Sequence, residues 1–205
     1  MRPAWSFKRD RMSRTKKIRT GRAFLFVIAA LASGTLRAAA LRPQSKEAEP
    51  QPLARGAAAP DFAVETRDGR TVRLSDFRRH IVILDFWATW CEPCRESLPH
   101  LDRVARSVGP RGVVVLAVCV WDSLKNFRSW VSGDFKDYRV RFAVDPAGHG
   151  SQEIPRRLYG VNGIPATFII GRNGNVAATV IGYDDGDTRI EKALAGLGIK
   201  TGERP

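Results

Sequence analysis

The chain is poor in cysteine and histidine, the residues that bind structural zinc. Its 205 residues include three cysteines, Cys91, Cys94 and Cys119, and three scattered histidines. A structural zinc site takes four Cys or His ligands, so a site built on the first two cysteines lacks partners. A purely structural disulfide also explains that pair badly, because closing so short a loop adds little stability. The sequence therefore predicts no metal site and a different use for Cys91 and Cys94.

The main part of the chain lacks a dense cluster of basic residues, although the whole chain carries a net charge of +13. Residues 1–40 contain ten Lys or Arg and one acid, a net charge of +9. Residues 41–205 contain 24 Lys or Arg and 20 acids, a net charge of +4. Domains that bind nucleic acids carry a basic patch or stripe. We therefore predict no nucleic-acid partner.

The N-terminal 40 residues have the layout of an export signal. A basic stretch precedes a 14-residue apolar run, 23–36, and small residues follow at 38–40, as in a cleavable signal peptide. A bilayer span needs about 20 apolar residues, so a membrane anchor at 1–40 is the alternative. Either segment directs the rest of the chain to the periplasm or to the outer face of the cytoplasmic membrane. The membrane is then contacted only through this segment.

The remaining sequence divides into a linker, one domain and a tail. Residues 41–57 are rich in Pro, Ala, Gln and charged residues, which predicts a flexible linker. Residues 58–200 are long enough for one domain with its own core, and 201–205 form a short tail. Within the domain we expect strands at 62–65, 71–74, 81–84, 113–120, 140–144, 167–171 and 176–181, and helical segments at 75–77, 91–108, 123–132, 154–159 and 188–197.

The two neighbouring cysteines lie where a buried strand gives way to a helix. The apolar run 81–84 predicts a strand covered on both faces, and apolar residues recur at helical spacing after Leu98. Cys91 therefore lies at a helix N-terminus, where free N–H groups and the helix dipole favour a thiolate. Cys94 follows one helical turn later, close enough to form a disulfide with it.

A buried acid and three further residues accompany the cysteine pair. Asp85 ends the apolar strand, and burial there raises the pKa of a carboxyl group toward neutrality, which suits a proton shuttle for Cys94. Trp90 directly precedes Cys91, and we expect it to form part of a partly exposed contact surface. Glu92 and Pro93, between the cysteines, are expected to tune the redox potential through local charge and backbone stiffness.

These motifs resemble the thioredoxin superfamily, and in particular its exported TlpA/ResA-like thiol–disulfide oxidoreductases. The resemblance covers about residues 58–198. It rests on APDF at 59–62, DFWATWCEPC at 85–94, the helix proline Pro99, and YGV at 159–161 leading into IPATF at 164–168. It implies a thioredoxin-like α/β fold, a central mixed β-sheet flanked by helices, with an extra N-terminal β-hairpin.

The resemblance also assigns roles to the site residues. Cys91 is the attacking cysteine, Cys94 is the resolving cysteine, and Asp85 is the buried acid that handles protons. Pro165 is a cis-proline facing the disulfide, which leaves the backbone of Ile164 free to pair with a substrate peptide. Many ResA-type proteins carry a glutamate at the position of Ser97, so here Asp85 is expected to carry the acid role alone.

The implied function is reduction of disulfides in exported proteins through the Cys-X-X-Cys dithiol, without a cofactor. The partners implied are protein dithiol or disulfide substrates, apocytochrome c among them, and a membrane thiol-electron donor. The sequence leaves the direction of electron flow open.

Other functions remain as alternatives to the reductase. A thioredoxin-like copper chaperone for oxidase assembly would use the two thiolates, with His149 as the one histidine in a loop that might reach them. A peroxidase needs a threonine three residues before its cysteine, and that position is Ala88. A non-catalytic interaction module is disfavoured by the intact cysteine pair. Cys119 is expected to be a buried, inert thiol, and His100 a solvated helix residue.

Overall fold

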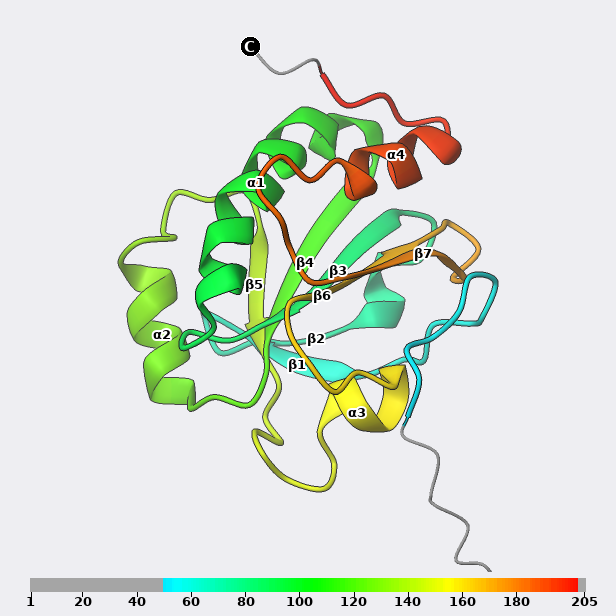
Figure 1. Cartoon of the computed structure of the whole chain (residues 1–205). Coiled ribbons are helices and arrows are strands. Elements are labelled where there is room, and N and C mark those ends of the chain that lie inside the picture. Colours follow the sequence, from blue (N-terminus) through cyan, green and yellow to red (C-terminus); the bar gives the residue numbers. More distant parts are fainter. Residues whose placement is uncertain (1–49, 203–205) are drawn as a thin grey trace, which may run out of the picture. The chain divides into compact units, whose positions relative to one another are not determined.

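The computed structural model describes residues 50–202 and consists there of a seven-stranded mixed sheet with helices on both faces (Figure 1). The strands, in sheet order, are β2 (Thr71–Arg73), β1 (Ala63–Thr66), β5 (Arg141–Val144), β4 (Val113–Cys119), β3 (Ile81–Trp87), β6 (Ala166–Ile170) and β7 (Val176–Ile181). The helices are η1 (Leu74–Phe77), α1 (Glu92–Val108), η2 (Gly109–Arg111), α2 (Leu124–Ser132), α3 (Ile154–Tyr159) and α4 (Arg189–Gly196). The thioredoxin-like architecture that the sequence predicted is thus confirmed.

The centre of the sheet is parallel and its edges are antiparallel. Strand β3 pairs with β4 in parallel, and β4 pairs with β5 in the same way. Strand β6 runs antiparallel to β3, and β7 antiparallel to β6. At the other edge, β1 pairs antiparallel with β2, which forms the hairpin expected near the start of the domain. The all-buried strand β3 therefore has partners on both sides and carries the chain into the cysteine helix.

Alternate residues of β3 face two separate cores. Ile81, Ile83 and Trp87 pack with buried residues of α1, α2 and α4 on one face. Val82, Leu84 and Phe86 pack with α3 and η1 on the other. Side chains of a strand alternate between the two faces, so Asp85 shares the α1 face with Ile83 and Trp87. This alternation places a carboxyl group inside the core that contains both cysteines.

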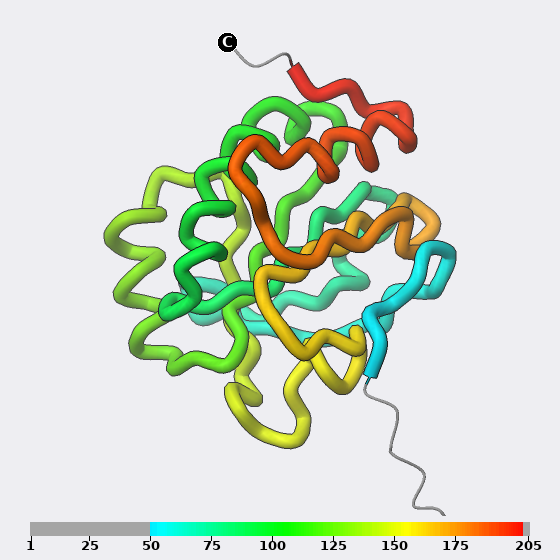
Figure 2. The backbone as a smooth tube through the Cα atoms, viewed as in Figure 1, coloured from blue at the N-terminus to red at the C-terminus, as the bar shows by residue number. Residues whose placement is uncertain are grey.

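The ordered domain begins earlier than the sequence predicted. Residues 51–57, assigned to the flexible linker, run alongside α3 and the β6–β7 hairpin (Figure 2). The N–H of Leu53 donates to the carbonyl of Tyr159, and the N–H of Gly56 donates to the carbonyl of Val176. Backbone groups that pair with a sheet edge are held whatever the composition of the segment, so the linker prediction is wrong for 51–57.

Two predictions fall outside the described part of the chain. The export signal or anchor at 1–40 lies outside residues 50–202, as does the linker up to residue 49. Within residues 50–202, no helix combines the length and apolar character needed to cross a membrane. Helix α1 runs without interruption through Pro99, from Glu92 to Val108.

Candidate active site

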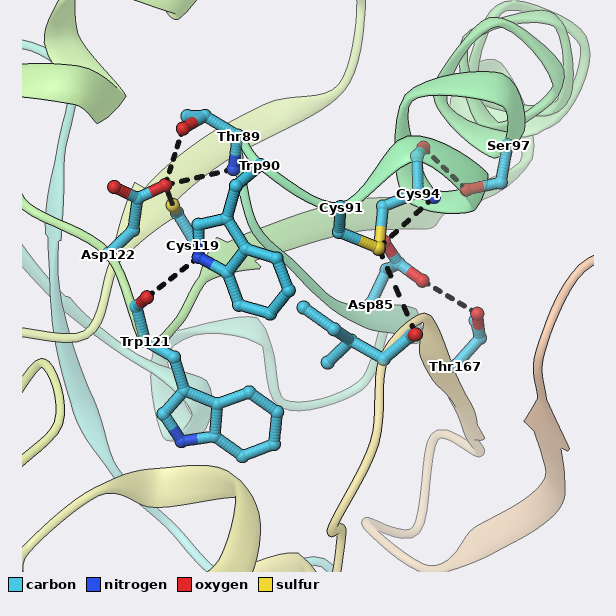
Figure 3. Close-up of a disulfide and its surroundings, with 11 residues drawn as sticks. Asp85, Thr89, Trp90, Cys91, Cys94, Ser97, Cys119, Trp121, Asp122 and Thr167 are labelled. Atoms are coloured by element: carbon cyan, nitrogen blue, oxygen red, sulfur yellow. Dashed lines mark hydrogen bonds between the residues drawn. A yellow bond between two sulfur atoms is a disulfide. The ribbon is translucent and has the colours of Figure 1, made fainter.

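Cys91 and Cys94 form a disulfide at the N-terminus of α1 (Figure 3). Their Cα atoms are 5.3 Å apart. Cys91 is the N-cap of the helix, and its Sγ accepts the backbone N–H of Cys94 at 3.3 Å. Cys91 keeps 4 % of its surface exposed, whereas Cys94 is fully buried. Both cysteines are thus buried, and only Cys91 retains a small exposed area.

The first turn of α1 supports a negative charge on Cys91. The unpaired N–H groups of a helix start and the helix dipole both stabilise an anion at that position. Glu92 and Pro93 form this first turn and are exposed. The hydroxyl of Ser97 donates to the carbonyl of Cys94 at 2.8 Å, and Ser97 is buried. Glu96 is exposed, so the position that carries a glutamate in many ResA-type proteins holds only this hydroxyl here.

Asp85 is the buried acid of the site. It is fully buried on β3, and the hydroxyl of Thr167 donates to its Oδ1 at 2.7 Å. Its Oδ2 has no hydrogen-bond partner within residues 50–202. Burial raises the pKa of Asp85 to about 7, because the core disfavours its charged form, and the Thr167 hydrogen bond only partly offsets this. The carboxyl group can therefore take up or release a proton near neutral pH.

Thr167 is a site residue that sequence reasoning did not single out. The register of β3 and β6 places it opposite Asp85, although 82 positions separate the two in sequence. It is also the one polar residue within β6 (ATFII), and it is buried. A single hydroxyl in an otherwise apolar strand could have marked Thr167 as a candidate site residue. The pairing of β6 with β3 that makes it a partner of Asp85 cannot be read from the sequence around Thr167.

The loop before β6 closes the site from the side opposite α1. The Ile164–Pro165 peptide bond is cis, as expected from the resemblance. The carbonyl oxygen of Ile164 lies 3.8 Å from the Sγ of Cys91. Pro165 is buried and Ile164 is half-buried. Within residues 50–202, the backbone N–H of Ile164 has no hydrogen-bond partner.

The loop before α1 is tied to the loop after β4. Asp122 Oδ2 accepts hydrogen bonds from the backbone N–H and the hydroxyl of Thr89, at 2.9 and 2.6 Å. The indole N–H of Trp90 donates to the carbonyl of Trp121 at 2.9 Å. Trp90 nevertheless remains 59 % exposed, which agrees with the expected contact surface. Sequence reasoning missed Asp122, an acid just beyond the carboxyl end of the strand beside β3.

Cys119 is fully buried, and it holds the only other sulfur in the described residues that could enter the chemistry. Burial, followed by the negative charge of Asp122, raises the pKa of its thiol far above the usual range. A thiol that stays protonated is a poor nucleophile, so the prediction of an inert thiol agrees with its surroundings.

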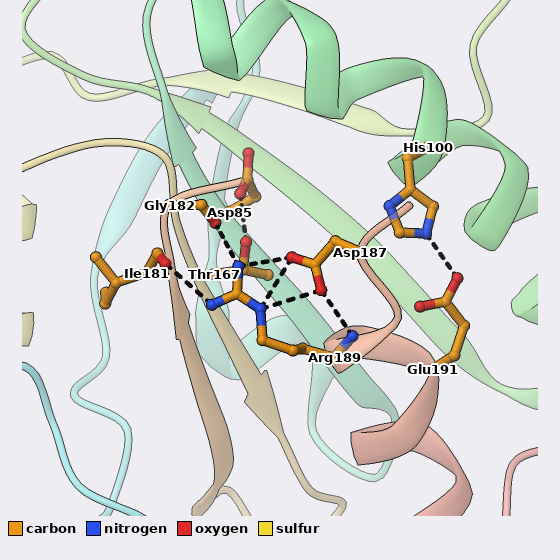
Figure 4. A network of polar contacts seen from close by, with 8 residues as sticks. All are labelled: Asp85, His100, Thr167, Ile181, Gly182, Asp187, Arg189 and Glu191. Atoms are coloured by element: carbon orange, nitrogen blue, oxygen red, sulfur yellow. Dashed lines mark hydrogen bonds and ion pairs between the residues drawn. The ribbon is translucent and has the colours of Figure 1, made fainter. Parts of the chain in front are cut away.

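His100 is not the solvated residue that the sequence suggested. It is buried, and its Nε2 lies 2.6 Å from Oε1 of Glu191 on α4 (Figure 4). Nearby, the Arg189 guanidinium pairs with Asp187 and donates to the carbonyl oxygens of Ile181 and Gly182. The packing of α4 on α1 buries His100, and this contact could not be read from α1 alone.

The described residues contain no group of three or more His, Cys, Asp or Glu side chains placed to hold a metal ion. His149 lines a groove together with Trp90. The copper-carrier alternative stays a prediction.

Comparison with known proteins identifies relatives that act on thiols and disulfides. The chain is 34 % identical to the thiol-disulfide oxidoreductase ResA of Geobacillus thermodenitrificans over 131 residues, which are 63 % of this chain and 71 % of that protein. It is 32 % identical to the thiol-disulfide oxidoreductase ResA of Bacillus subtilis over 130 residues, or 63 % and 69 % of the two chains.

Solved structures agree with these relatives. A Chlorobium tepidum protein described as a candidate thiol:disulfide interchange protein DsbE has a TM-score of 0.62 at 33 % identity, covering 71 % of this chain and 98 % of its own. An exposed lipoprotein thioredoxin from Streptococcus pneumoniae has a TM-score of 0.56 at 32 % identity, covering 66 % and 99 %. The model for the AhpC/TSA family matches residues 55–179. With a Cys-X-X-Cys disulfide at the start of a helix in a thioredoxin-like fold, the chain belongs to the AhpC/TSA family as a ResA-like thiol–disulfide oxidoreductase.

Proposed function

We propose that this protein reduces disulfides in exported proteins, with Cys91 attacking, Cys94 resolving and Asp85 moving the proton. The observation that carries the proposal is the arrangement of these three groups. The more exposed sulfur caps α1, the other sulfur is buried behind it, and an ionisable carboxyl group faces the same core with one oxygen unpartnered among residues 50–202.

In the first step the Cys91 thiolate attacks one sulfur of the substrate disulfide. A bond forms between Cys91 Sγ and that sulfur, the substrate S–S bond breaks, and the other substrate sulfur leaves as a thiolate that takes a proton from water. The helix N-terminus and the N–H of Cys94 favour the thiolate form of Cys91 at neutral pH. The product is a mixed disulfide between protein and substrate.

In the second step Cys94 resolves the mixed disulfide. Its thiol gives its proton to Asp85, whose pKa of about 7 allows it to accept one near neutral pH. The Cys94 thiolate attacks Cys91 Sγ, the bond to the substrate breaks, and the second substrate thiolate leaves. Two electrons have then passed from the protein dithiol to the substrate, and the protein holds the Cys91–Cys94 disulfide.

The residues around the disulfide position the substrate. Ile164 offers a carbonyl beside Cys91 and a backbone N–H that no group in residues 50–202 accepts, so a substrate strand can pair with it. Pro165 contributes no N–H of its own, and Trp90 supplies an exposed aromatic contact. Glu92 and Pro93, exposed in the first turn of α1, set the redox potential through charge and stiffness.

The proposed working place is the periplasm or the outer face of the cytoplasmic membrane. The basic and apolar segments of residues 1–40 support export as a signal peptide or an anchor. An oxidising compartment favours disulfides, so the protein must be re-reduced by a membrane thiol donor after each turnover. An apocytochrome c whose two haem-site cysteines are joined in a disulfide is the proposed substrate class. Residues 41–50 then act as a spacer before the domain.

Trapping in cells tests both the roles and the direction. A Cys94→Ser variant should accumulate protein substrates as mixed disulfides on Cys91 that a reductant releases, whereas Cys91→Ser should capture none. Alkylation of free thiols in acid-quenched cells should find wild-type Cys91 and Cys94 largely reduced, and oxidised once the thiol donor is deleted. A pair that is fully oxidised with and without donors would contradict the reductase role.

A further inference from the structure

A groove opens beside the active site at Trp90. Its volume is about 680 Å³, and its walls include Trp90, Trp121, His149, Arg156, Arg157 and Asn162. We call it the Trp90 groove. Trp90 directly precedes Cys91, and Asn162 lies two residues before Ile164, whose carbonyl is beside the Cys91 sulfur. The groove is therefore lined by residues that flank the cysteine loop and the cis-proline loop in sequence, although Cys91 and Ile164 do not themselves line it.

One wall of the groove is held in an unusual backbone conformation. Trp121 has a φ of +53°, a left-handed value that is rare for a bulky residue. Its carbonyl accepts the indole N–H of Trp90, and its own indole N–H donates to the carboxylate of Glu153. Residues in such conformations persist only where their surroundings fix them, and they gather at binding sites. The two aromatic side chains are thus fixed relative to each other and to the cysteine loop.

The charges around the groove are unequally paired. Glu153 is buried, is bound to Trp121, and lies 3.5 Å from Nε of Arg156. Arg156 also donates to the side chain of Asn162. The side chain of Arg157 is exposed, and its guanidinium group forms no hydrogen bond or close ion pair within residues 50–202, although its charge acts on the carboxyl group of Asp145. The groove therefore presents one guanidinium group that is not hydrogen-bonded within residues 50–202, next to two aromatic side chains.

We propose that the Trp90 groove binds the stretch of substrate polypeptide next to the reactive cysteine, and that Arg157 selects stretches carrying a carboxylate side chain there. This inference rests on Cys91 as the attacking sulfur. The substrate cysteine is held at Cys91 by the exchange reaction, so the neighbouring residues of the same chain lie across Trp90. A guanidinium group prefers a carboxylate partner, and the aromatic walls accommodate the rest of the peptide.

The test compares three disulfide peptides that differ at one position beside the cysteines, with Glu, Gln or Lys. Second-order rate constants for thiol–disulfide exchange are measured with the full-length protein at about 20 mM and about 500 mM NaCl. Surface charges are weakly screened at the lower salt concentration and strongly screened at the higher one. We expect the Glu peptide to react roughly three- to fivefold faster than the Lys peptide at low salt, as one exposed ion pair allows. High salt should remove the difference, because screening then acts over a few ångströms.

Charge variants separate Arg157 from the overall charge of the protein. Arg157→Glu should reverse the preference and favour the Lys peptide. Arg111→Glu makes the same change of charge in η2, which precedes β4 at the sheet end opposite Cys91, and should leave the preference intact. Equal rates for all three peptides with the wild-type protein would overturn the groove proposal, as would an Arg111→Glu variant that behaves like Arg157→Glu.

Two further measurements ask whether the peptide preference depends on the direction of electron flow, and whether the protein's own linker occupies the Trp90 groove. The peptide preference should appear in both directions, with reduced protein and peptide disulfide or with oxidised protein and peptide dithiol, because both directions pass through the same mixed disulfide. The peptide preference therefore does not depend on the direction of electron flow in cells. It can still be measured if the proposed reductase role is wrong. If Glu47→Gln with Glu49→Gln speeds all three peptides equally, the chain's own linker fills the groove and the proposal is wrong.

Discussion

Replacement of Asp85 by Asn should change how the stability of the protein depends on pH. Asp85 is fully buried, and its pKa is raised from an ordinary 3.8 to about 7 by that burial. Below about pH 4 the carboxyl group holds its proton in both the folded and the unfolded chain. Between about pH 4 and pH 7 the unfolded chain releases the proton while the folded protein retains it, so stability falls as pH rises. Above about pH 7 both states are ionised and the loss is complete.

The size of this effect follows from the shift in pKa. One pKa unit corresponds to about 1.36 kcal/mol, so a shift of about three units destabilises the folded wild type by about 4 kcal/mol between pH 4 and pH 8. An Asn side chain has no charge to bury and keeps an oxygen to accept the Thr167 hydroxyl. The free energy of unfolding of Asp85→Asn should therefore be similar to that of wild type near pH 4 and about 4 kcal/mol higher than that of wild type at pH 8.

Urea unfolding of the oxidised proteins from about pH 4 to about pH 8.5 measures this difference. Other titrating groups, including the buried Asp145 whose pKa is also raised by burial, are common to both proteins and cancel in the comparison. If the difference in free energy of unfolding between the two proteins stays constant across the pH range, the assignment of a near-neutral pKa to Asp85 is refuted. The proton-shuttle role would then lose its physical basis.

Three further experiments test the burial of Cys119, the packing of residues 51–57 and the role of Asp85 in catalysis. Cys119 should resist alkylation by iodoacetamide at about pH 8 in the folded protein, because its thiol is buried and its pKa is strongly raised. It should react once urea unfolds the chain, and intact mass spectrometry measures the label. Rapid labelling of the folded protein would contradict the burial of Cys119. Gly160→Ala should lower the free energy of unfolding by more than the about 1–2 kcal/mol that a left-handed alanine costs, because the new Cβ would also collide with the carbonyl of Gln51. Gly174→Ala is the control, because Gly174 has the same left-handed backbone but open space around it. Equal losses for the two variants in urea unfolding would show that residues 51–57 do not pack against Gly160. Asp85→Asn should slow resolution by Cys94, so that the mixed disulfide accumulates in quenched reactions; unchanged accumulation would remove Asp85 from proton transfer.

Local patterns in the sequence predicted most of the elements. The apolar run at 81–84 and the helical spacing after it locate β3 and α1, and turn signals such as Asn173-Gly174 separate β6 from β7. The same apolar run favoured burial of Asp85, which ends it, and the family resemblance supplied its role as the buried acid. The cysteine pair followed from its place at the start of a helix, whereas the site proline followed from the family resemblance.

Contacts between distant segments were beyond those patterns. Thr167 faces Asp85 only because β6 pairs with β3 in one register. His100 is buried because α4 packs across α1 and supplies Glu191. Residues 51–57 have the composition of a linker, yet their backbone groups pair with the β6–β7 hairpin and α3. Each of these features depends on a partner far away in the sequence, which no local propensity records.

The reduction potential of the Cys91–Cys94 pair tests the central claim most directly. It is measured by equilibrating the protein with glutathione or dithiothreitol couples and quantifying free thiols by alkylation. A protein that reduces exported disulfides should have a potential near that of thioredoxin, about −270 mV. A potential near that of DsbA, about −120 mV, identifies a disulfide donor, and the reductase proposed here would be contradicted.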